Sequence, residues 1–297
     1  MRRREDAVKK LKLGLPKGSL QENTFELFRK AGFKIRAEDR AYKPWCDDEE
    51  LDITLVRAQE IPSYVEKGVF DCGITGRDWI LEMNANVHEV AELLYAKSGF
   101  RPVRWVVAVP EDSPIRTIRQ LRGKRIATEL AGYVRRYFKS QRIPVDVEFS
   151  WGATEVKVPE LVDAIVELTE TGRSLRANKL KIIHELLVST TRVIANRDAW
   201  KDPCKREKMD NIVLLLQGAL QAEGMVGLKM NIRADALSRI EHVLPALKKP
   251  TISHLSDPKW VALEVILEEK QVKRIIPSLK KAGATGIIEY PLTKVVY

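Results

Sequence analysis

Apolar residues in the first hundred positions recur in short runs of period two, and each run is followed by a segment of helical period. Period two is typical of strands, and a period near 3.6 is typical of helices. The expected pairs of strand and helix are 11–16 with 21–31, 52–56 with 59–67, and 71–75 with a helix from Gly76. Strands that alternate with helices predict a mainly parallel α/β sheet, whose ligands bind beyond the carboxyl ends of the strands.

A second α/β unit is expected after Pro110. Its elements are a helix over 117–121, a strand over 124–128, a helix over 132–141, and strands over 145–149 and 163–168. Strand 103–109 leads into this unit, and a long strand over about 185–195 carries the chain back to the first unit. Two crossing segments predict a hinged, two-lobed cleft of the kind that periplasmic binding proteins have.

The last part of the chain has a different order of elements. We expect strand 225–232, helix 234–247, strands 251–255 and 260–267, helix 270–282 and strand 285–289. The order βαββαβ is that of a ferredoxin-like module, which is common among small regulatory domains. The predicted fold class is therefore α/β, with a two-lobed core and a ferredoxin-like C-terminal domain. The predicted domains are 1–105 with 196–222, 106–195, and 223–297.

Composition agrees with several compact units. The chain has 297 residues and 44% hydrophobic content, which is more than one core usually holds. The longest uncharged apolar run, about 211–222, is shorter than the roughly 20 residues that span a bilayer. The sequence shows no signal peptide, and Cys46, Cys72 and Cys204 are too scattered for a disulfide framework. These features predict a soluble protein of the reducing cytoplasm, with Cys72 as a small buried residue.

The net charge of +10 is compatible with nucleic acid, anionic lipid or phosphorylated small molecules as ligands. Residues 1–12 hold six basic and two acidic residues, so this short extension supplies +4 of the +10. A solvated tail is favoured over a nucleic-acid-binding arm, because most other basic residues alternate with acidic ones. We therefore expect neither a nucleic acid nor a membrane as partner.

The segment 163–175 carries the clearest chemistry. Asp163 and Glu167 stand four residues apart on a predicted strand, so period two places both on one face, and we expect both to face one site. The run Thr171-Gly172-Arg173-Ser174 offers hydroxyls, a cation and the amides of a helix start, which are the parts of a phosphate-binding loop. Neighbouring carboxylates suit ribose hydroxyls or hydrated Mg²⁺. An ordinary strand end with a Thr-Gly turn fits the spacing equally well.

This segment resembles the phosphoribosyl-diphosphate loop of the ATP phosphoribosyltransferase family, whose pattern is close to D-A-I-x-D-L-x-x-T-G-x-T-L. The run Leu15-Pro-Lys-Gly-Ser-Leu20 is similar to the family's first βα turn, and 51–57 resembles its second strand. The run 71–78 is nearly the whole family motif D-x-G-I-T-G-x-D, and Arg125-Ile-Ala-Thr-Glu129 is similar to another motif. The resemblance covers essentially everything after residue 10.

The resemblance implies that ATP and 5-phosphoribosyl 1-diphosphate react, with Mg²⁺, to give N1-(5-phosphoribosyl)-ATP and diphosphate, the first step of histidine biosynthesis. The residues that it implies for catalysis are Asp163 and Glu167. Those that it implies for phosphoribosyl diphosphate are Thr171, Gly172, Arg173, Ser174 and Leu175. Those that it implies for ATP or the diphosphate are Lys17, Gly18, Arg57, Asp71, Gly73, Thr75, Gly76, Arg104 and Glu155. No direct metal ligands are assigned.

The C-terminal module resembles domain III of the long form of this family, which binds histidine as feedback inhibitor. The run 249–260 is its most specific piece. Carried over by position, the inhibitor contacts are Asn231, Leu247, Thr251, Ile266 and Gly286. The family often has Asp where Asn231 stands, and an amide oxygen still accepts hydrogen bonds. The resemblance also implies homo-oligomers, from dimers to hexamers, with L-histidine favouring a compact hexamer.

Two other classes of function remain open from the residues. A non-catalytic, two-lobed ligand-binding protein would share the hinged architecture, but it would not need the Thr-Gly phosphate loop. A nucleic-acid-binding regulator would use the positive charge, but the sequence shows no helix-turn-helix. The four histidines, His88, His184, His242 and His254, show no metal-ligand spacing.

Overall fold

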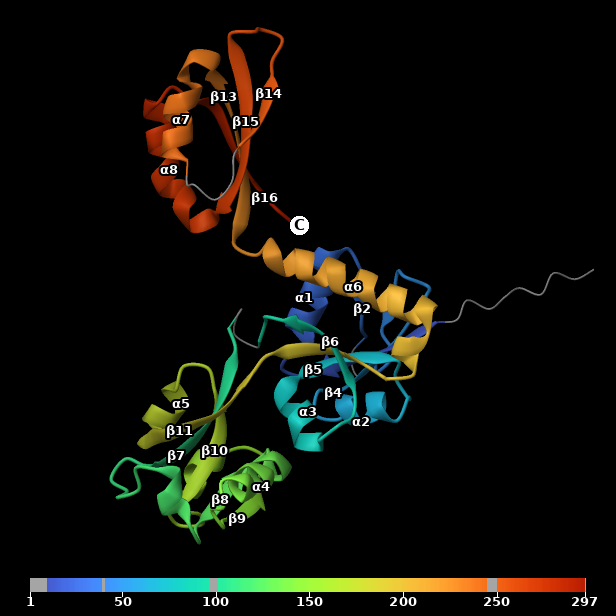
Figure 1. The fold of residues 1–297 in the computed structure, drawn as a ribbon, viewed down its shortest axis with the longest axis vertical. Coiled ribbons are helices and arrows are strands. Elements are labelled where there is room, and N and C mark those ends of the chain that lie inside the picture. Colours follow the sequence, from blue (N-terminus) through green and yellow to red (C-terminus); the bar gives the residue numbers. More distant parts are fainter. Residues whose placement is uncertain (1–9, 39–40, 97–100, 245–249, 297) are drawn as a thin grey trace, which may run out of the picture. The chain divides into compact units, whose positions relative to one another are not determined.

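The protein is described from a computed structural model, which places residues 10–38, 41–96, 101–244 and 250–296. It divides into two compact units, residues 1–213 and residues 214–297, which are described separately. Figure 1 shows the first unit as two lobes, each built on its own sheet. We use "first lobe" for the part around the sheet β4-β1-β5-β12-β6 and "second lobe" for the part around the sheet β11-β7-β10-β8-β9.

The first lobe alternates strands with helices, as its sequence predicts. The strands are β1 (Leu11–Lys17), β4 (Leu51–Arg57), β5 (Cys72–Gly76), β6 (His88–Leu93) and β12 (Thr191–Ala195), with the short pair β2 (Ile35–Arg36) and β3 (Trp45–Cys46). The helices are α1 (Gln21–Ala31), α2 (Ile61–Glu66), α3 (Arg77–Met83) and α6 (Pro203–Gln221), with the turn η3 (Ala199–Lys201). Helix α1 ends at Gly32, whose φ of 106° suits a residue without a side chain.

The second lobe repeats this design. The strands are β7 (Val103–Pro110), β8 (Arg125–Thr128), β9 (Asp146–Phe149), β10 (Ala164–Thr169) and β11 (Leu180–Ser189). The helical segments are η1 (Ile118–Leu121), α4 (Ala131–Ser140), η2 (Thr154–Lys157) and α5 (Arg173–Ala177). In each lobe three neighbouring strands run parallel, β4-β1-β5 in the first and β9-β8-β10 in the second.

The expectation of mainly parallel sheets is confirmed, because only one strand in each sheet, a crossing segment, runs against the other four. In the first sheet β12 runs antiparallel to both β5 and β6, and in the second sheet β7 runs antiparallel to both β10 and β11. The long strand expected over 185–195 is two strands, β11 and β12, which belong to different sheets. The chain does return to the first lobe there, so the two-lobed core is confirmed, whereas the hinge stays a prediction.

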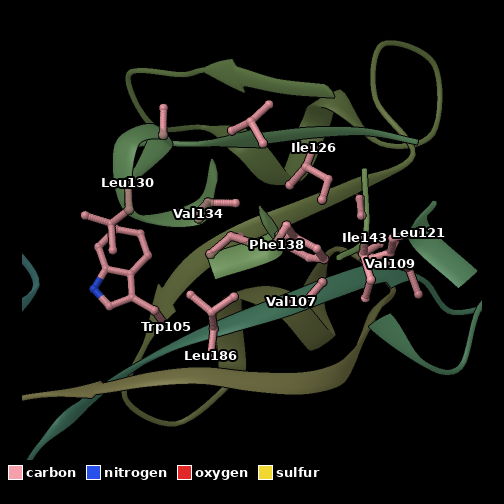
Figure 2. Packing of buried hydrophobic residues seen from close by; sticks show 14 of the residues in the cluster. Trp105, Val107, Val109, Leu121, Ile126, Leu130, Val134, Phe138, Ile143 and Leu186 are labelled. Atoms are coloured by element: carbon pink, nitrogen blue, oxygen red, sulfur yellow. The ribbon is translucent and has the colours of Figure 1, made fainter. Parts of the chain in front are cut away.

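The second lobe has a well-packed core. Figure 2 shows Trp105 and Val107 of β7 directed toward Val134 and Phe138 of α4, with Leu186 of β11 beside them. Trp105 and Phe138 are each 1% exposed, so these rings are removed from water. Burial of this kind contributes roughly 1.5–3 kcal/mol for a large apolar side chain. The crossing strand β7 is therefore fixed firmly to the second lobe.

The C-terminal unit is a four-stranded antiparallel sheet in the order β14-β15-β13-β16. Its elements are β13 (Met225–Arg233), η4 (Ala234–Ala236), α7 (Leu237–Val243), β14 (Thr251–His254), β15 (Trp260–Glu268), α8 (Glu269–Lys281) and β16 (Thr285–Pro291). Figure 1 shows α7 and α8 together on one side of this sheet. The predicted order βαββαβ is confirmed, whereas the exact domain boundaries stay predictions.

Helix α6 was not expected from the sequence. Its first half is rich in charge and its second half is apolar, so no single helical period runs through its 19 residues. No helix within the described residues is long and apolar enough to cross a membrane. The three cysteines carry free thiols, and Cys72 is 2% exposed, as expected for a small residue of the core.

Candidate active site

A cavity of about 500 Å³ lies where the strands of both lobes end. Lys17 ends β1, Arg57 ends β4 and Gly76 ends β5, and all three line the cavity. From the second lobe, Glu129 follows β8 and Glu167 stands near the end of β10. The volume lies within the range of roughly 300–1,000 Å³ that small-molecule sites have. The cavity therefore lies beyond the carboxyl ends of strands in both lobes, which is where α/β sheets usually bind ligands.

Five of the residues predicted from the sequence line this cavity: Lys17, Gly18, Arg57, Gly76 and Glu167. The Lys17 ammonium lies 3.9 Å from the centroid of the Tyr42 ring and 3.5 Å from the Ala41 carbonyl oxygen. A cation over an aromatic face is attracted by the ring quadrupole. Tyr42 thus holds one of the cavity's cations at the end of β1.

Three carboxyl groups of the cavity hold their protons more tightly than usual. Burial raises the pKa of Asp78, which is 3% exposed. Burial, and then the charge of Asp78, raise the pKa of Glu129. Burial also raises the pKa of Glu167, to which the Thr154 hydroxyl donates a hydrogen bond and near which Glu155 adds negative charge. The cavity therefore combines strand-end cations with carboxyl groups that a bound cation or ligand donor would help to ionise.

Asp78 is bound to both crossing segments. Its Oδ2 accepts a hydrogen bond from Trp105 Nε1 at 2.8 Å, and its backbone amide donates to the Ser189 hydroxyl at 3.0 Å. Gly76 leaves the room for this carboxylate, because a Cβ at that position would stand 2.1 Å from Asp78 Oδ1. Gly76 thus has a packing role as well as a place in the cavity.

The structure does not bring Asp163 and Glu167 together, which corrects the expectation of one shared site. Asp163 precedes β10 and accepts hydrogen bonds from the Arg125 amide at 2.9 Å and from Lys124 Nζ at 3.1 Å. A strand rises about 3.3 Å per residue, so a separation of four residues is about 13 Å along the strand. Burial raises the pKa of Asp163, but these hydrogen bonds outweigh it and lower that pKa.

Asp71 occupies the same position in the first lobe that Asp163 occupies in the second. Asp71 precedes β5 and accepts from the Lys12 amide at 2.9 Å, with Lys205 Nζ at 2.6 Å. In both lobes the aspartate lies at the start of a parallel strand and accepts the amide directly opposite on its neighbour. Both aspartates thus lie at the edge of the sheet away from the cavity, and neither lines it.

Gly73 and Thr75 support β5 from inside the lobe. A Cβ on Gly73 would stand 2.5 Å from Ile61 Cγ2, so this glycine lets α2 pack closely on the strand. The Thr75 hydroxyl is buried and donates to the Ala58 carbonyl oxygen at 2.7 Å. Ala58 and Gln59 line the cavity, so Thr75 acts on the cavity through the turn that follows Arg57.

The predicted phosphate loop, 171–175, is held by hydrogen bonds of its own, but its residues do not line the cavity. Gly172 adopts a φ of 72°, and its amide donates to the Thr169 hydroxyl at 2.7 Å. The Ser174 hydroxyl donates to the Glu155 carboxylate at 2.5 Å, so two predicted residues meet here. Arg173 is exposed at the start of α5, and Leu175 is buried under the loop. These contacts place the loop directly after β10, the strand that carries Glu167.

Arg104 does not line the cavity, although Val103 and Trp105 on either side of it do. It lies on β7, where its guanidinium forms an ion pair with Glu185 at 3.2 Å. The two side chains are 39% and 44% exposed, and exposed pairs of this kind contribute about 0–1 kcal/mol. The ion pair therefore leaves Arg104 able to exchange partners.

In the C-terminal unit the predicted inhibitor contacts share the sheet face that α7 and α8 leave open. Val226, Leu228, Met230 and Ile232 of β13 belong to the core, so Asn231 points to the opposite face. Register places Thr251 and Ile266 on that same face. Gly286 lies beside Asn231, since a Cβ on Gly286 would stand 3.7 Å from Asn231 Nδ2. Leu247 lies outside the described residues.

Several residues of the cavity were missed in the sequence analysis. Asp78, Glu129, Glu170, Trp105 and Ser189 all line it. Asp78 ends the motif D-x-G-I-T-G-x-D, and Glu129 ends the Thr-Glu pair, so both stood inside runs that resemble the family. Glu129 directly follows the predicted strand 124–128, and this position alone would have indicated that it lies at the cavity.

The described residues contain no group of three His, Cys, Asp or Glu side chains that could hold a metal ion by themselves. Mg²⁺ is usually held by one or two carboxylates together with substrate phosphates and water. Glu129 and Glu167, which line the cavity, fit that more modest requirement.

Two family comparisons cover most of the chain. The sequence model described as ATP phosphoribosyltransferase matches residues 57–218. The one described as "HisG, C-terminal domain" matches residues 222–294.

Similar proteins agree with these matches. The "ATP phosphoribosyltransferase" of Thermodesulfovibrio yellowstonii is 62% identical over 288 residues, which are 97% of this chain and 99% of the relative. The protein of the same name from Chlorobium phaeovibrioides is 57% identical and covers 96% of this chain and 97% of its own. Among solved structures, the "ATP phosphoribosyl transferase (HisG:HisZ) complex from Thermotoga maritima" aligns with a TM-score of 0.61 at 30% identity, over 71% of this chain and 98% of that one.

Proposed function

The chain belongs to the ATP phosphoribosyltransferase family, and from that premise we propose that the cavity between the lobes is where its reaction takes place. The reaction condenses ATP with 5-phosphoribosyl 1-diphosphate to N1-(5-phosphoribosyl)-ATP and diphosphate, the first step of L-histidine biosynthesis. One observation carries the proposal. Cations at the ends of two first-lobe strands and carboxyl groups of the second lobe line one cavity of about 500 Å³.

The chemistry requires alignment more than a reactive side chain. Adenine N1 carries a lone pair, so the new bond from N1 to ribose C1 needs no protein nucleophile. The bond from C1 to the diphosphate oxygen breaks, positive charge develops on the ribose, and negative charge leaves with the diphosphate. A site that aligns the two substrates and stabilises both charges supplies the catalysis.

The strand-end cations are assigned to the phosphates. Lys17 and Arg57 would bind the triphosphate of ATP or the leaving diphosphate, and Gly18 and Gly76 would border the nucleotide. Tyr42 keeps the Lys17 ammonium in place by the contact at 3.9 Å. Arg104 would exchange Glu185 for a phosphate when the substrate binds, because its ion pair is exposed.

The second lobe is assigned to the phosphoribosyl group. Thr171, Gly172, Arg173 and Ser174 would bind the 5-phosphate, with Leu175 fixing the loop from below. Glu155 accepts a hydrogen bond from Ser174 and would yield that hydroxyl to the phosphate. Glu167 would accept hydrogen bonds from the ribose hydroxyls and stabilise the charge on C1. Asp163, Asp71, Gly73 and Thr75 then act by holding the strands that carry these groups.

Mg²⁺ is the proposed cofactor, and when bound it would neutralise phosphate charge. Glu129 and Glu167 are the carboxylates that would reach it, since both line the cavity. The protein's own contribution is to keep these carboxyl groups in a half-buried site, where burial raises their pKa and a cation favours their ionised form. The proposed compartment is the cytoplasm.

Turnover in the presence of ATP, 5-phosphoribosyl 1-diphosphate and Mg²⁺, followed by the absorbance of the N1-substituted adenine, tests the proposal. We expect Lys17→Met to raise the KM for ATP about 10- to 100-fold, because a charge-assisted contact is lost. Lys201→Met is the matched control, since Lys201 forms an exposed ion pair with Asp198 on the surface, and it should leave KM unchanged. No product from the intact chain would favour a binding protein, and an equal KM in both variants would remove Lys17 from the site.

We also propose that the open sheet face of the C-terminal unit binds L-histidine as feedback inhibitor. Asn231, Thr251, Ile266 and Gly286 lie on or beside this face, and the 43% exposed Ile266 leaves apolar area to be covered there. Histidine would act by binding one homo-oligomer, a compact hexamer, more tightly than the dimer and so shifting the population toward it.

Deleting residues from 224 onward should leave turnover that histidine no longer inhibits. Asn231→Ala in the intact chain is a second, smaller perturbation of the same face, and it should weaken inhibition without changing uninhibited turnover. Light scattering with and without histidine would measure the assembly directly. Inhibition of the truncated chain at the same histidine concentration would place the inhibitor site elsewhere.

A further inference from the structure

Helix α3 follows a strand of the first sheet and packs on both lobes, with Ile80 in the first-lobe core. Trp79 contacts the second-lobe core, and its ring stands edge-on to the Trp105 ring with centroids 6.2 Å apart. The preceding residue, Asp78, accepts the Trp105 indole N–H at 2.8 Å. The first half of α3 is therefore attached to the crossing strand β7.

The second half of α3 is attached to α4 of the second lobe. Glu82 Oε1 accepts the Gly132 amide at 2.9 Å, and Glu82 Oε2 accepts the Tyr133 amide at 2.7 Å. The first amides of a helix have no partner within it, and a carboxylate is favoured there by the helix dipole. The residue before α4 is Leu130, whose side chain has no oxygen to accept these amides. A side chain from the first-lobe segment thus provides the cap of a second-lobe helix.

The contact is reciprocal. The Arg136 guanidinium on α4 donates to the Leu81 carbonyl oxygen and, at 3.1 Å, to the Glu82 carbonyl oxygen at the end of α3. Gly132 permits the close approach, because a Cβ there would stand 3.0 Å from Glu82 Oε1 and 3.1 Å from Glu82 O. A side chain of each helix therefore forms hydrogen bonds with backbone groups at the end of the other helix.

We propose that Glu82 is a positioning residue for the transfer reaction. By capping α4 it fixes the position of the second lobe relative to α3. Helix α3 begins directly after Gly76, which lines the cavity. The inference rests on the proposed function, in which ATP phosphates bind the strand ends of the first lobe and the phosphoribosyl group binds the second. Glu82 itself does not line the cavity, so it acts only through the relative position of the two lobes.

This role separates binding from turnover. Lys17 and Arg57 both stand on the first lobe, so ATP alone can bind them whatever the setting of the second lobe. Transfer needs N1 and C1 in contact, and a misplacement of about 1 Å can cost roughly 100-fold in rate. Loss of the Glu82 cap should therefore lower kcat while the affinity for ATP alone is kept.

The experiment compares Glu82→Ala, Glu82→Gln and Arg136→Ala with a matched control, Glu66→Ala, in the full-length chain. Glu66 also accepts a backbone amide, that of Asn86 at 2.8 Å, but both residues belong to the first lobe. The measurements are kcat and KM for both substrates, the Kd of ATP by calorimetry without the second substrate, and the thermal midpoint. Arg136→Ala removes the reciprocal contact from the other helix and serves if Glu82→Ala does not fold.

We expect Glu82→Ala to lower kcat about 10- to 100-fold with the Kd of ATP within about twofold of wild type. Glu82→Gln keeps one acceptor oxygen and should lose less. A kcat equal to that of Glu66→Ala would overturn the positioning role, as would a loss of ATP affinity as large as the loss of kcat. Absence of product from the wild type would instead overturn the proposed function.

Discussion

Replacing Asp163 and Glu167 one at a time with their amides separates a carboxylate that holds strands from one that works in the cavity. Asp163→Asn removes the charge that binds the Arg125 amide and Lys124 at the start of β10. Glu167→Gln removes the charge that lines the cavity but keeps an oxygen for the Thr154 hydroxyl. Both substitutions replace a carboxylate by its amide, so a difference in their effects reports where each side chain lies relative to the cavity.

The magnitude for Asp163 follows from its contacts. A hydrogen bond to a charged group contributes about 1.5–3 kcal/mol, and asparagine keeps one acceptor. The side chains of Asp163 and Lys124 are 30% and 44% exposed, so screening reduces the ion pair to about 0–1 kcal/mol. A net loss of about 1–2 kcal/mol corresponds to a fall of about 2–8 °C in the thermal midpoint for a unit of this size. We expect kcat to stay within about threefold of wild type.

For Glu167 the expected effects are reversed. Loss of an electrostatic contact to a developing charge costs on the order of 100- to 1,000-fold in kcat. The thermal midpoint should change little, because burial makes the ionised carboxylate costly and the amide carries no charge. Product absorbance gives kcat and thermal unfolding gives the midpoint. If Asp163→Asn lowers kcat as far as Glu167→Gln while its midpoint stays unchanged, the separation of roles is refuted.

Three further substitutions test the packing of the lobes. Phe138→Ala should lower stability by about 3–5 kcal/mol, measured as urea unfolding, and a smaller loss would mean that the core around it collapses. Gly73→Ala should lower the thermal midpoint, because its Cβ would stand 2.5 Å from Ile61, and an unchanged midpoint would show that α2 moves freely. Burial raises the pKa of Asp78, so the unfolded chain releases a proton that the folded chain keeps, and stability falls as pH rises above 3.8. Asp78→Asn should therefore gain on the wild type with rising pH, whereas parallel midpoint curves would contradict the assignment.

Much of the fold and part of the site followed from local pattern. Alternating strands and helices predicted two lobes, and the strand-end rule predicted at which edge of the sheets a ligand binds. Lys17, Arg57 and Gly76 were assigned through the family resemblance, and all three line the cavity at that edge. The long strand expected over 185–195 was wrong, because an apolar run does not show the point at Thr190 where a chain passes from one sheet to another. Continuity of hydrophobic residues says nothing about which sheet buries them.

The separation of Asp163 from Glu167 was predictable in principle. Period two fixes the face of a strand on which a side chain lies, but the rise per residue fixes how far along the strand it lies. Four residues carry a side chain from the edge with the cavity to the opposite edge. Both quantities are needed before two residues of one strand can be assigned to one site.

Other features of the site leave no local pattern. Asp78 meets Trp105, 27 residues away, and Ser189, 111 residues away. Glu82 caps a helix 50 residues further along the chain. Such contacts depend on how two lobes pack, so a single sequence shows the carboxylates but not their partners.

Asp71 and Asp163 make the same contact in the two lobes, and this contact affects which parts of the sequence can change. Each fixes the register of two parallel strands at the edge remote from the cavity. The carboxyl ends of these strands, at the cavity, are then not needed to fix the register. The turns after β1, β5 and β10 can therefore gain, lose or exchange residues while the strands keep their pairing. Selection for a new ligand could therefore reshape the cavity by altering loops alone, while both sheets stay as they are.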